Sequence, residues 1–203
     1  MIKKLTLSAL LVAGAFASNA QQVILNVMNP STIAGVYAHT NQGNGSAWGL
    51  ANLLDPADAV LDTLVMMDDG DTNQNNSYGY VFPQSYCGCD SSGVMNSSVD
   101  FSGKIVLISR GSCEFGKKAY LAQLRGAVGV IIYNAFLDSD PSGGMINMAG
   151  GVYGINVTIP VAFVVNGTGQ TLKDELDNGT TVVAFLGAKA GAFGNDLAMS
   201  ANK

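Results

Sequence analysis

Cysteine and histidine have the most versatile chemistry of the side chains in this sequence, and there are few of them. The chain has three cysteines, Cys87, Cys89 and Cys113, and a single histidine, His39. In an exported protein two of the cysteines are expected to pair, which leaves one thiol over. A zinc site built from all four residues is the weaker alternative, because structural zinc sites favour C-x2-C or wider spacing. We therefore expect one disulfide, no metal and no cofactor.

Hydrolytic chemistry would need a nucleophile paired with a base, or a metal with an open coordination position. The sequence has no G-x-S-x-G segment, and a single histidine cannot supply an H-E-x-x-H motif. His39 could still join a Ser-His-Asp triad, since such triads are assembled in space, and a hydrolase using His39 is kept as an alternative. The pattern favours a chain that is not an enzyme.

A group of oxygen-bearing side chains has the alternate spacing with which calcium loops present their ligands: Asp69, Asp71 and Asn73. An EF-hand requires glycine where Gln74 stands and glutamate where Tyr80 stands, so the motif is broken. We interpret the group as a solvated acidic turn.

The most regular part of the sequence is a strand, a helix and a second strand in close succession. Ile105–Ser109 and Val128–Tyr133 are apolar runs rich in β-branched residues, and Phe115–Arg125 between them has Leu121 and Leu124 on one helical face. A connection of this kind is right-handed and makes the two strands parallel. The sequence therefore predicts a mixed α/β fold with a βαβ core.

Shorter apolar runs on both sides of this unit predict more strands. They are Val23–Val27, Ile33–Tyr37, Val60–Met67, Ile159–Val165 and Thr181–Leu186. Leu172 and Leu176 predict a small helix with one apolar stripe. The segment Phe136–Asn156 is rich in glycine and aspartate, and we expect it to be an exposed loop.

The amino-terminal segment predicts export. Two lysines are followed by the apolar run Leu5–Phe16 and by small residues ending at Ala20, which is the pattern of a cleaved signal peptide. Residues 1–20 are therefore expected to be removed, and no later segment is long and apolar enough to span a membrane. About 180 residues remain, which suits one domain. The formal net charge of −5 argues against a nucleic acid partner.

Residues around the turn after the first core strand are more specific than the periodicity. The segments GKIVLI and RGSCEF are followed by Lys117 or Lys118, by Ala122-Gln123, Gly126-Ala127 and Asn134, and later by Thr158-Ile159-Pro160-Val161. Together they closely resemble the protease-associated domain. The resemblance implies a swivelling β/β/α fold with small flanking helices over residues 21–186, with residues 187–203 as a linker or truncated tail. It also implies a disulfide from Cys113 to Cys89, with Cys87 as the second choice of partner.

The resemblance further implies a non-catalytic, secreted module that binds protein or peptide. Such modules occur in secreted peptidases and in sorting receptors, so the expected role is to aid substrate access to a peptidase domain or to dock a partner; a free-standing binding protein is the alternative. The turn lies where a strand ends and a helix begins, where backbone N–H groups are free to bind a ligand. The expected ligand-contacting residues are Arg110, Gly111, Ser112, Met145, Met148 and Tyr153. The competing interpretation is that Arg110 pairs with an acid and that the loop is a spacer.

Overall fold

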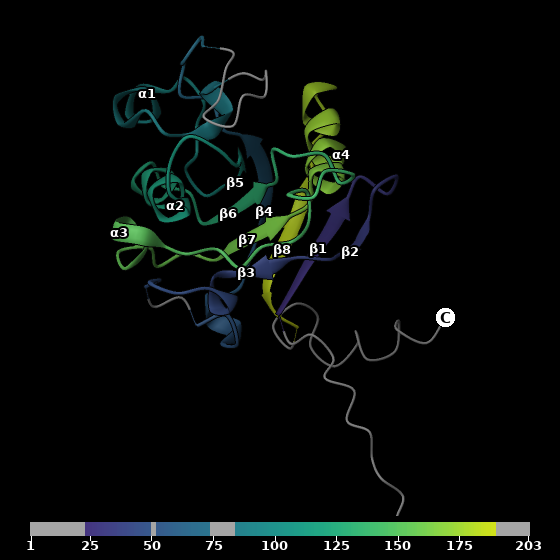
Figure 1. The fold of residues 1–203 in the computed structure, drawn as a ribbon. Coiled ribbons are helices and arrows are strands. Elements are labelled where there is room, and N and C mark those ends of the chain that lie inside the picture. Colours follow the sequence, from purple (N-terminus) through teal and green to yellow (C-terminus); the bar gives the residue numbers. More distant parts are fainter. Residues whose placement is uncertain (1–22, 50–51, 74–83, 190–203) are drawn as a thin grey trace, which may run out of the picture.

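A computed structural model describes residues 23–49, 52–73 and 84–189 of the chain (Figure 1). The predicted signal peptide and most of the predicted tail lie outside these residues. The strands are β1 (Val23–Asn29), β2 (Gly35–Tyr37), β3 (Thr40–Asn41), β4 (Val60–Met66), β5 (Ile105–Ser109), β6 (Gly129–Tyr133), β7 (Val161–Val164) and β8 (Val183–Ala188). The helices are α1 (Ser91–Asn96), α2 (Phe115–Leu124), α3 (Gly151–Gly154) and α4 (Asn166–Asp177), with short 3-10 turns η1 (Gln42–Asn44), η2 (Pro56–Asp58) and η3 (Gln84–Cys87).

The strands form one mixed sheet in the order β2-β1-β8-β4-β5-β6-β7-β3. Its centre is parallel, from β4 through β5 and β6 to β7, whereas β8 runs antiparallel to both β1 and β4. The predicted βαβ unit is confirmed as β5, α2 and β6, with Ile105 opposite Gly129. The mixed α/β fold class is confirmed with it. Among the described residues, no helix has the length and apolar character needed to cross a bilayer.

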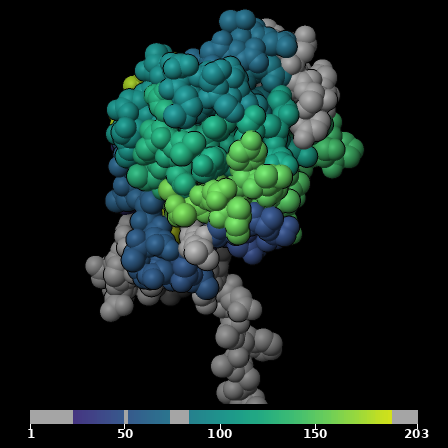
Figure 2. Space-filling model, turned by 90° about the vertical axis from the view of Figure 1, so that its left-hand side faces the viewer, coloured from purple at the N-terminus to yellow at the C-terminus, as the bar shows by residue number. Residues whose placement is uncertain are grey.

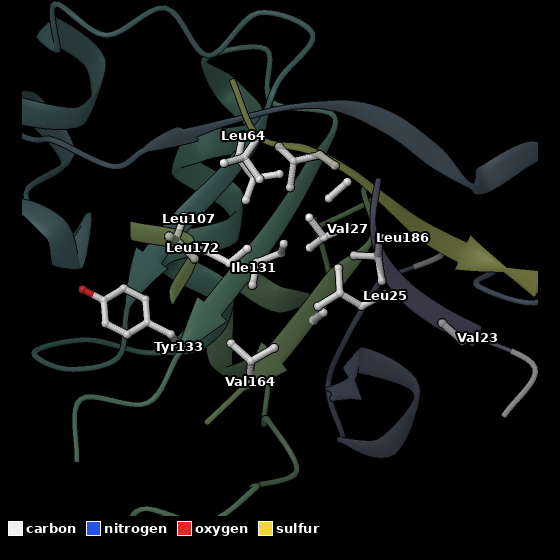
Figure 3. Packing of buried hydrophobic residues seen from close by; sticks show 14 of the residues in the cluster. Val23, Leu25, Val27, Leu64, Leu107, Ile131, Tyr133, Val164, Leu172 and Leu186 are labelled. Carbon is white, nitrogen blue, oxygen red and sulfur yellow. The ribbon is translucent and has the colours of Figure 1, made fainter. Parts of the chain in front are cut away.

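The sheet curls strongly. Its two edge strands, β2 and β3, are separated in the chain only by Ala38 and His39. Because a residue adds at most about 3.5 Å of length, the ends of these edges lie within about 10 Å of each other. The curl brings Leu25 of β1 into the same buried cluster as Ile131 of β6 (Figure 3).

Side chains alternate between two buried layers, as expected for strands covered on both faces. Ile105 and Leu107 of β5 point into the curled side of the sheet, where Leu172 of α4 covers them. Val106 and Ile108 point to the opposite face, which α1, α2 and α3 cover (Figure 1). This alternation explains why β5 and β6 have no exposed residue.

Three details differ from the sequence-based expectations. Leu124 of α2 is 51% exposed and does not share the buried face of Leu121. The segment expected to be an exposed loop contains α3, and its Met148 is fully buried. Strand β8 continues through Gly187 and Ala188, two residues into the segment expected to be a linker. In each case packing against a distant element, which local composition does not encode, decides the outcome.

Helices α2 and α3 are in direct backbone contact. A Cβ atom at Gly116 would lie 1.9 Å from the carbonyl oxygen of Gly150 and 2.5 Å from the backbone nitrogen of Gly154. Figure 2 views this face, where the light green surface around residue 150 lies against the teal-green surface of α2. Only glycine at position 116 permits this approach.

The contact predicts that Gly116→Ala destabilises the fold. Alanine is favoured over glycine by about 1 kcal/mol in a helix interior, but the new methyl group would overlap backbone atoms that cannot rotate away. We expect a net loss of about 1–3 kcal/mol in the free energy of unfolding, measured by urea denaturation. Gly144→Ala is the matched control, because nothing lies within 4 Å of its added Cβ. Equal stability of the two variants would contradict the packing described.

Candidate functional site

The turn between β5 and α2, Arg110–Glu114, has an unusual backbone. Gly111 has a φ of 134° and Ser112 a φ of 64°, so both lie in the left-handed region that most side chains avoid. The hydroxyl of Ser112 donates to Oε1 of Gln84 at 2.6 Å. At the end of the turn, Oε2 of Glu114 accepts from the N–H of Val152 at 3.1 Å and ties the turn to α3. Contacts with two distant segments therefore hold this strained backbone in place.

A disulfide between Cys89 and Cys113 joins the turn to the segment before α1. This confirms the pairing that the family resemblance implied. The third cysteine, Cys87, carries a free thiol and is fully buried. The bridge fixes the carboxyl end of β5 against the η3–α1 connection, which is 24 residues away in sequence.

Lys118 lies below the turn and is fully buried. Its Nζ donates to the carbonyl oxygens of Gly111 and Cys87, both at 2.6 Å, and lies 3.3 Å from Sγ of Cys89. Burial lowers the pKa of the Lys118 ammonium to about 8, because the charged form loses its hydration. The Lys118 ammonium therefore binds one carbonyl from each of the two segments that the disulfide joins.

A buried carboxylate completes this network. Oδ2 of Asp69 accepts from the backbone N–H groups of Cys89 at 3.1 Å and Asp90 at 3.2 Å, and its Oδ1 accepts from Asp71 at 3.1 Å. Burial raises the pKa of the Asp69 carboxyl. The segment with the spacing of a calcium loop thus forms successive turns closed by its own carboxylates, as expected for an acidic turn. The expectation that the whole group is solvated is wrong for Asp69, which is buried.

Arg110 is half-buried and organises the loop after β6. Its Nη1 donates to Oδ1 of Asn134 at 3.1 Å and lies 3.5 Å from the carbonyl oxygen of Ser142, and its guanidinium lies 5.0 Å from the centre of the Phe136 ring. Fully buried Asn134 donates in turn to the carbonyls of Ser142 and Gly144, at 2.9 and 3.1 Å. Through these contacts Arg110 and Asn134 together support the loop that follows β6.

The structure brings together some of the predicted site residues and separates others. Arg110, Gly111 and Ser112 share the turn, and Ser112 is exposed there. Met148 is fully buried in the core under α2, so its side chain does not line the surface. Tyr153 is on α3, 38% exposed and 5.9 Å from the ring of Tyr120.

Two residues beside Arg110 were not among the predicted site residues: Asn134 and Phe136. Both follow the carboxyl end of β6, which is the strand next to β5 in the parallel part of the sheet. Residues after neighbouring parallel strands meet at one edge, so their position after the second apolar run was the signal available in the sequence.

His39 lies between β2 and β3 and is 8% exposed. Its Nδ1 is 3.0 Å from the carbonyl oxygen of Tyr37, which fixes this nitrogen as the donor. Burial lowers the pKa of the His39 imidazole, so the ring is neutral at pH 7.

The depressed pKa of Lys118 predicts a pH-dependent contribution to stability. Between its folded value of about 8 and its ordinary value of 10.5, the unfolded chain binds the proton more tightly. The contribution of Lys118 to the free energy of unfolding is therefore largest above pH 10.5 and is lost as the pH falls through about 8. We expect a difference on the order of 3 kcal/mol between these limits.

The measurement compares Lys118 with Lys118→Met, both in a Cys87→Ala background that has no free thiol to exchange at alkaline pH. Urea unfolding at intervals from pH 7 to pH 11 gives the difference in stability between the two proteins. Groups common to both proteins cancel in this difference. If the difference in stability between the two proteins stays constant from pH 7 to pH 11, burial does not lower the pKa of the Lys118 ammonium.

Comparison with known proteins supports the family resemblance in both sequence and fold. The family model described as the PA domain matches residues 60–172. A Xenopus laevis protein named "ER degradation-enhancing alpha-mannosidase-like protein 3" is 34% identical over 107 residues, which are 52% of this chain and 11% of that protein. An Aspergillus fumigatus protein named "Probable leucine aminopeptidase 2" is 34% identical over 82 residues, 40% of this chain and 15% of that protein.

Among solved structures, an aminopeptidase from Aneurinibacillus sp. strain AM-1 has a similar fold. The TM-score is 0.55 at 20% sequence identity, over 83% of this chain and 30% of that one. The chain thus spans less than two thirds of each of these proteins. The family model, in contrast, matches more than half of the chain and includes the whole β5–turn–α2 unit. This protein therefore belongs to the PA domain family.

Proposed function

We propose that the chain is a non-catalytic binding module of an exported protein, and that it binds protein or peptide segments for an associated peptidase domain. The observation that carries this proposal is the turn Arg110–Ser112, a strained loop that the disulfide, Lys118 and Gln84 hold in one conformation. A preorganised loop loses little entropy when it binds a ligand. Similarity to part of two aminopeptidases supports the peptidase context.

The chemistry of the turn suits an extended peptide. The Arg110 guanidinium is half-buried and rigidly placed by Asn134 and Phe136, so it can donate to a carbonyl or carboxylate oxygen with little reorganisation. Ser112 is exposed in the same turn, and its hydroxyl oxygen, which donates its proton to Gln84, can accept a hydrogen bond from a ligand N–H. Of the predicted wall residues, half-buried Met145 and exposed Tyr153 remain candidates for ligand contact.

Export is part of the same proposal. The disulfide between Cys89 and Cys113 is the kind of bond that persists in an oxidising compartment. The amino-terminal segment ending at Ala20 has the pattern of a signal peptide. A free-standing secreted binding protein is the second candidate, and it differs from the first in having no peptidase partner.

Peptide binding can be tested with the purified chain immobilised on resin and a digest of β-casein as the probe. We expect the wild type to retain a subset of casein peptides, identified by mass spectrometry, and Arg110→Ala to retain fewer. Lys104→Ala is the matched control, because it removes one positive charge at the opposite end of β5. Arg110→Ala also removes the hydrogen bond to Asn134 and the contact with Phe136, so we expect it to lower stability by about 1–3 kcal/mol while the protein stays folded at the temperature of the binding assay.

Two results would contradict the site. Equal retention by the wild type and both variants would show that Arg110 makes no ligand contact. A large fall in the melting temperature of Arg110→Ala, with peptide retention unchanged, would show that Arg110 only supports the loop after β6 and does not contact the ligand.

The absence of catalysis is tested separately. We expect no hydrolysis of aminoacyl p-nitroanilides or p-nitrophenyl esters above background, because His39 is buried and donates to the Tyr37 carbonyl. His39→Ala is the control. Activity that copurifies with the wild type and is lost in His39→Ala would favour the hydrolase alternative instead.

A further inference from the structure

The thiol of Cys87 is buried beside the disulfide and has no part in the proposed binding function. Cys87 is fully buried, and its carbonyl oxygen accepts from Nζ of Lys118 at 2.6 Å. Its Sγ lies 3.9 Å from Oγ of Ser112, the residue next to Cys113 in the chain. Sγ of Cys89 lies 3.6 Å from the Cys87 carbonyl oxygen. Cys87 therefore contacts Cys89, one of the bridged residues, and Ser112, the neighbour of the other bridged residue, Cys113.

The two bridge sulfurs differ in their surroundings. Nζ of Lys118 is 3.3 Å from Sγ of Cys89, and the ammonium is held there by its bonds to the carbonyls of Gly111 and Cys87. A nearby cation stabilises a thiolate, and a sulfur that is stabilised as a thiolate is the better leaving group in disulfide exchange. Attack on Sγ of Cys113, which expels Cys89, is therefore the favoured direction.

We propose that the bridge has two positions and moves from Cys89–Cys113 to Cys87–Cys113 by internal exchange. Burial raises the pKa of the Cys87 thiol and keeps water away from it, so the step begins with a local opening of this region, in which the thiol gives its proton to hydroxide. The Cys87 sulfur then attacks Sγ of Cys113. A Cys87–Cys113 bond forms as the Cys89–Cys113 bond breaks, and the electron pair leaves on Sγ of Cys89 as a thiolate beside the Lys118 ammonium. The number of disulfides and thiols is unchanged, so no external oxidant or reductant is needed.

The exchange changes which thiol the protein presents. Cys87 is fully buried, whereas Cys89 is half-buried and leads directly into α1. A half-buried thiolate next to an ammonium is the environment that makes cysteine nucleophilic. The exchanged form therefore carries a reactive site at Cys89, which an alkylating agent or the disulfide of another molecule can modify.

Trapping tests the exchange in the wild-type chain. Protein purified without reductant is incubated at pH 8 with iodoacetamide and digested, and the alkylated cysteine and bridged peptides are located by fragmentation in the mass spectrometer. We expect the alkyl group on Cys89, together with a Cys87–Cys113 bridge. Alkylation confined to Cys87, or none, would overturn the proposal. In Cys87→Ala the Cys89 label should be lost, and label on Cys89 in that variant would also overturn it.

The Cys89→Ala variant tests the second position of the bridge directly. We expect it to form a Cys87–Cys113 disulfide when it is expressed with a signal peptide into an oxidising compartment. Titration of thiols in denaturant should then detect none. Two free thiols per chain would show that Cys87 does not reach Cys113. The casein peptide experiment with Arg110→Ala is unaffected by either result, so the two proposals fail independently.

Discussion

The buried ammonium of Lys118 is the constraint on which the turn and its surroundings depend. An unpaired charge in a protein interior costs several kcal/mol, so Lys118 can be buried only where oxygens are fixed to receive it. Those oxygens are the carbonyls of Gly111 and Cys87, which belong to segments on opposite sides of the disulfide. The cation therefore holds the β5–α2 turn and η3 against each other and keeps the left-handed conformation of Ser112 in place.

A second cation plays the same part at the other end of α2. Arg125 donates to the carbonyl oxygens of Val94, Met95, Ser97 and Val99, at 2.6 to 3.1 Å. These carbonyls belong to the end of α1 and the chain after it, where the last carbonyls of a helix lack partners of their own. Helix α2 thus carries a cation at each end that binds the η3–α1 region, and the segment is held there by charge-assisted bonds rather than by strand pairing.

The motif that identifies the family is mostly structural. Within the motif Cys113 forms the bridge and Glu114 binds α3. Just after RGSCEF, Gly116 allows α3 to approach and Lys118 binds the carbonyls below the turn. This support leaves Arg110 and Ser112 at the surface on a backbone that cannot relax. A binding loop on a stable scaffold needs a rigid backbone and exposed side chains, and this turn has both.

Local sequence patterns determined the core of this protein, and long-range packing decided the rest. The apolar runs of β5 and β6, with α2 between them, were readable because their periodicity is local, and the cysteine pairing was available from the family motif around Cys113. The burial of Lys118 was not predictable, because its partners are carbonyls 7 and 31 residues away that only folding brings together. The burial of Met148 and the exposure of Leu124 follow from where α3 packs on α2, and the curl of the sheet follows from the short link between β2 and β3. Tertiary structure alone decided which predicted site residues reach the surface, because a side chain's exposure depends on what folds over it and not on its own type.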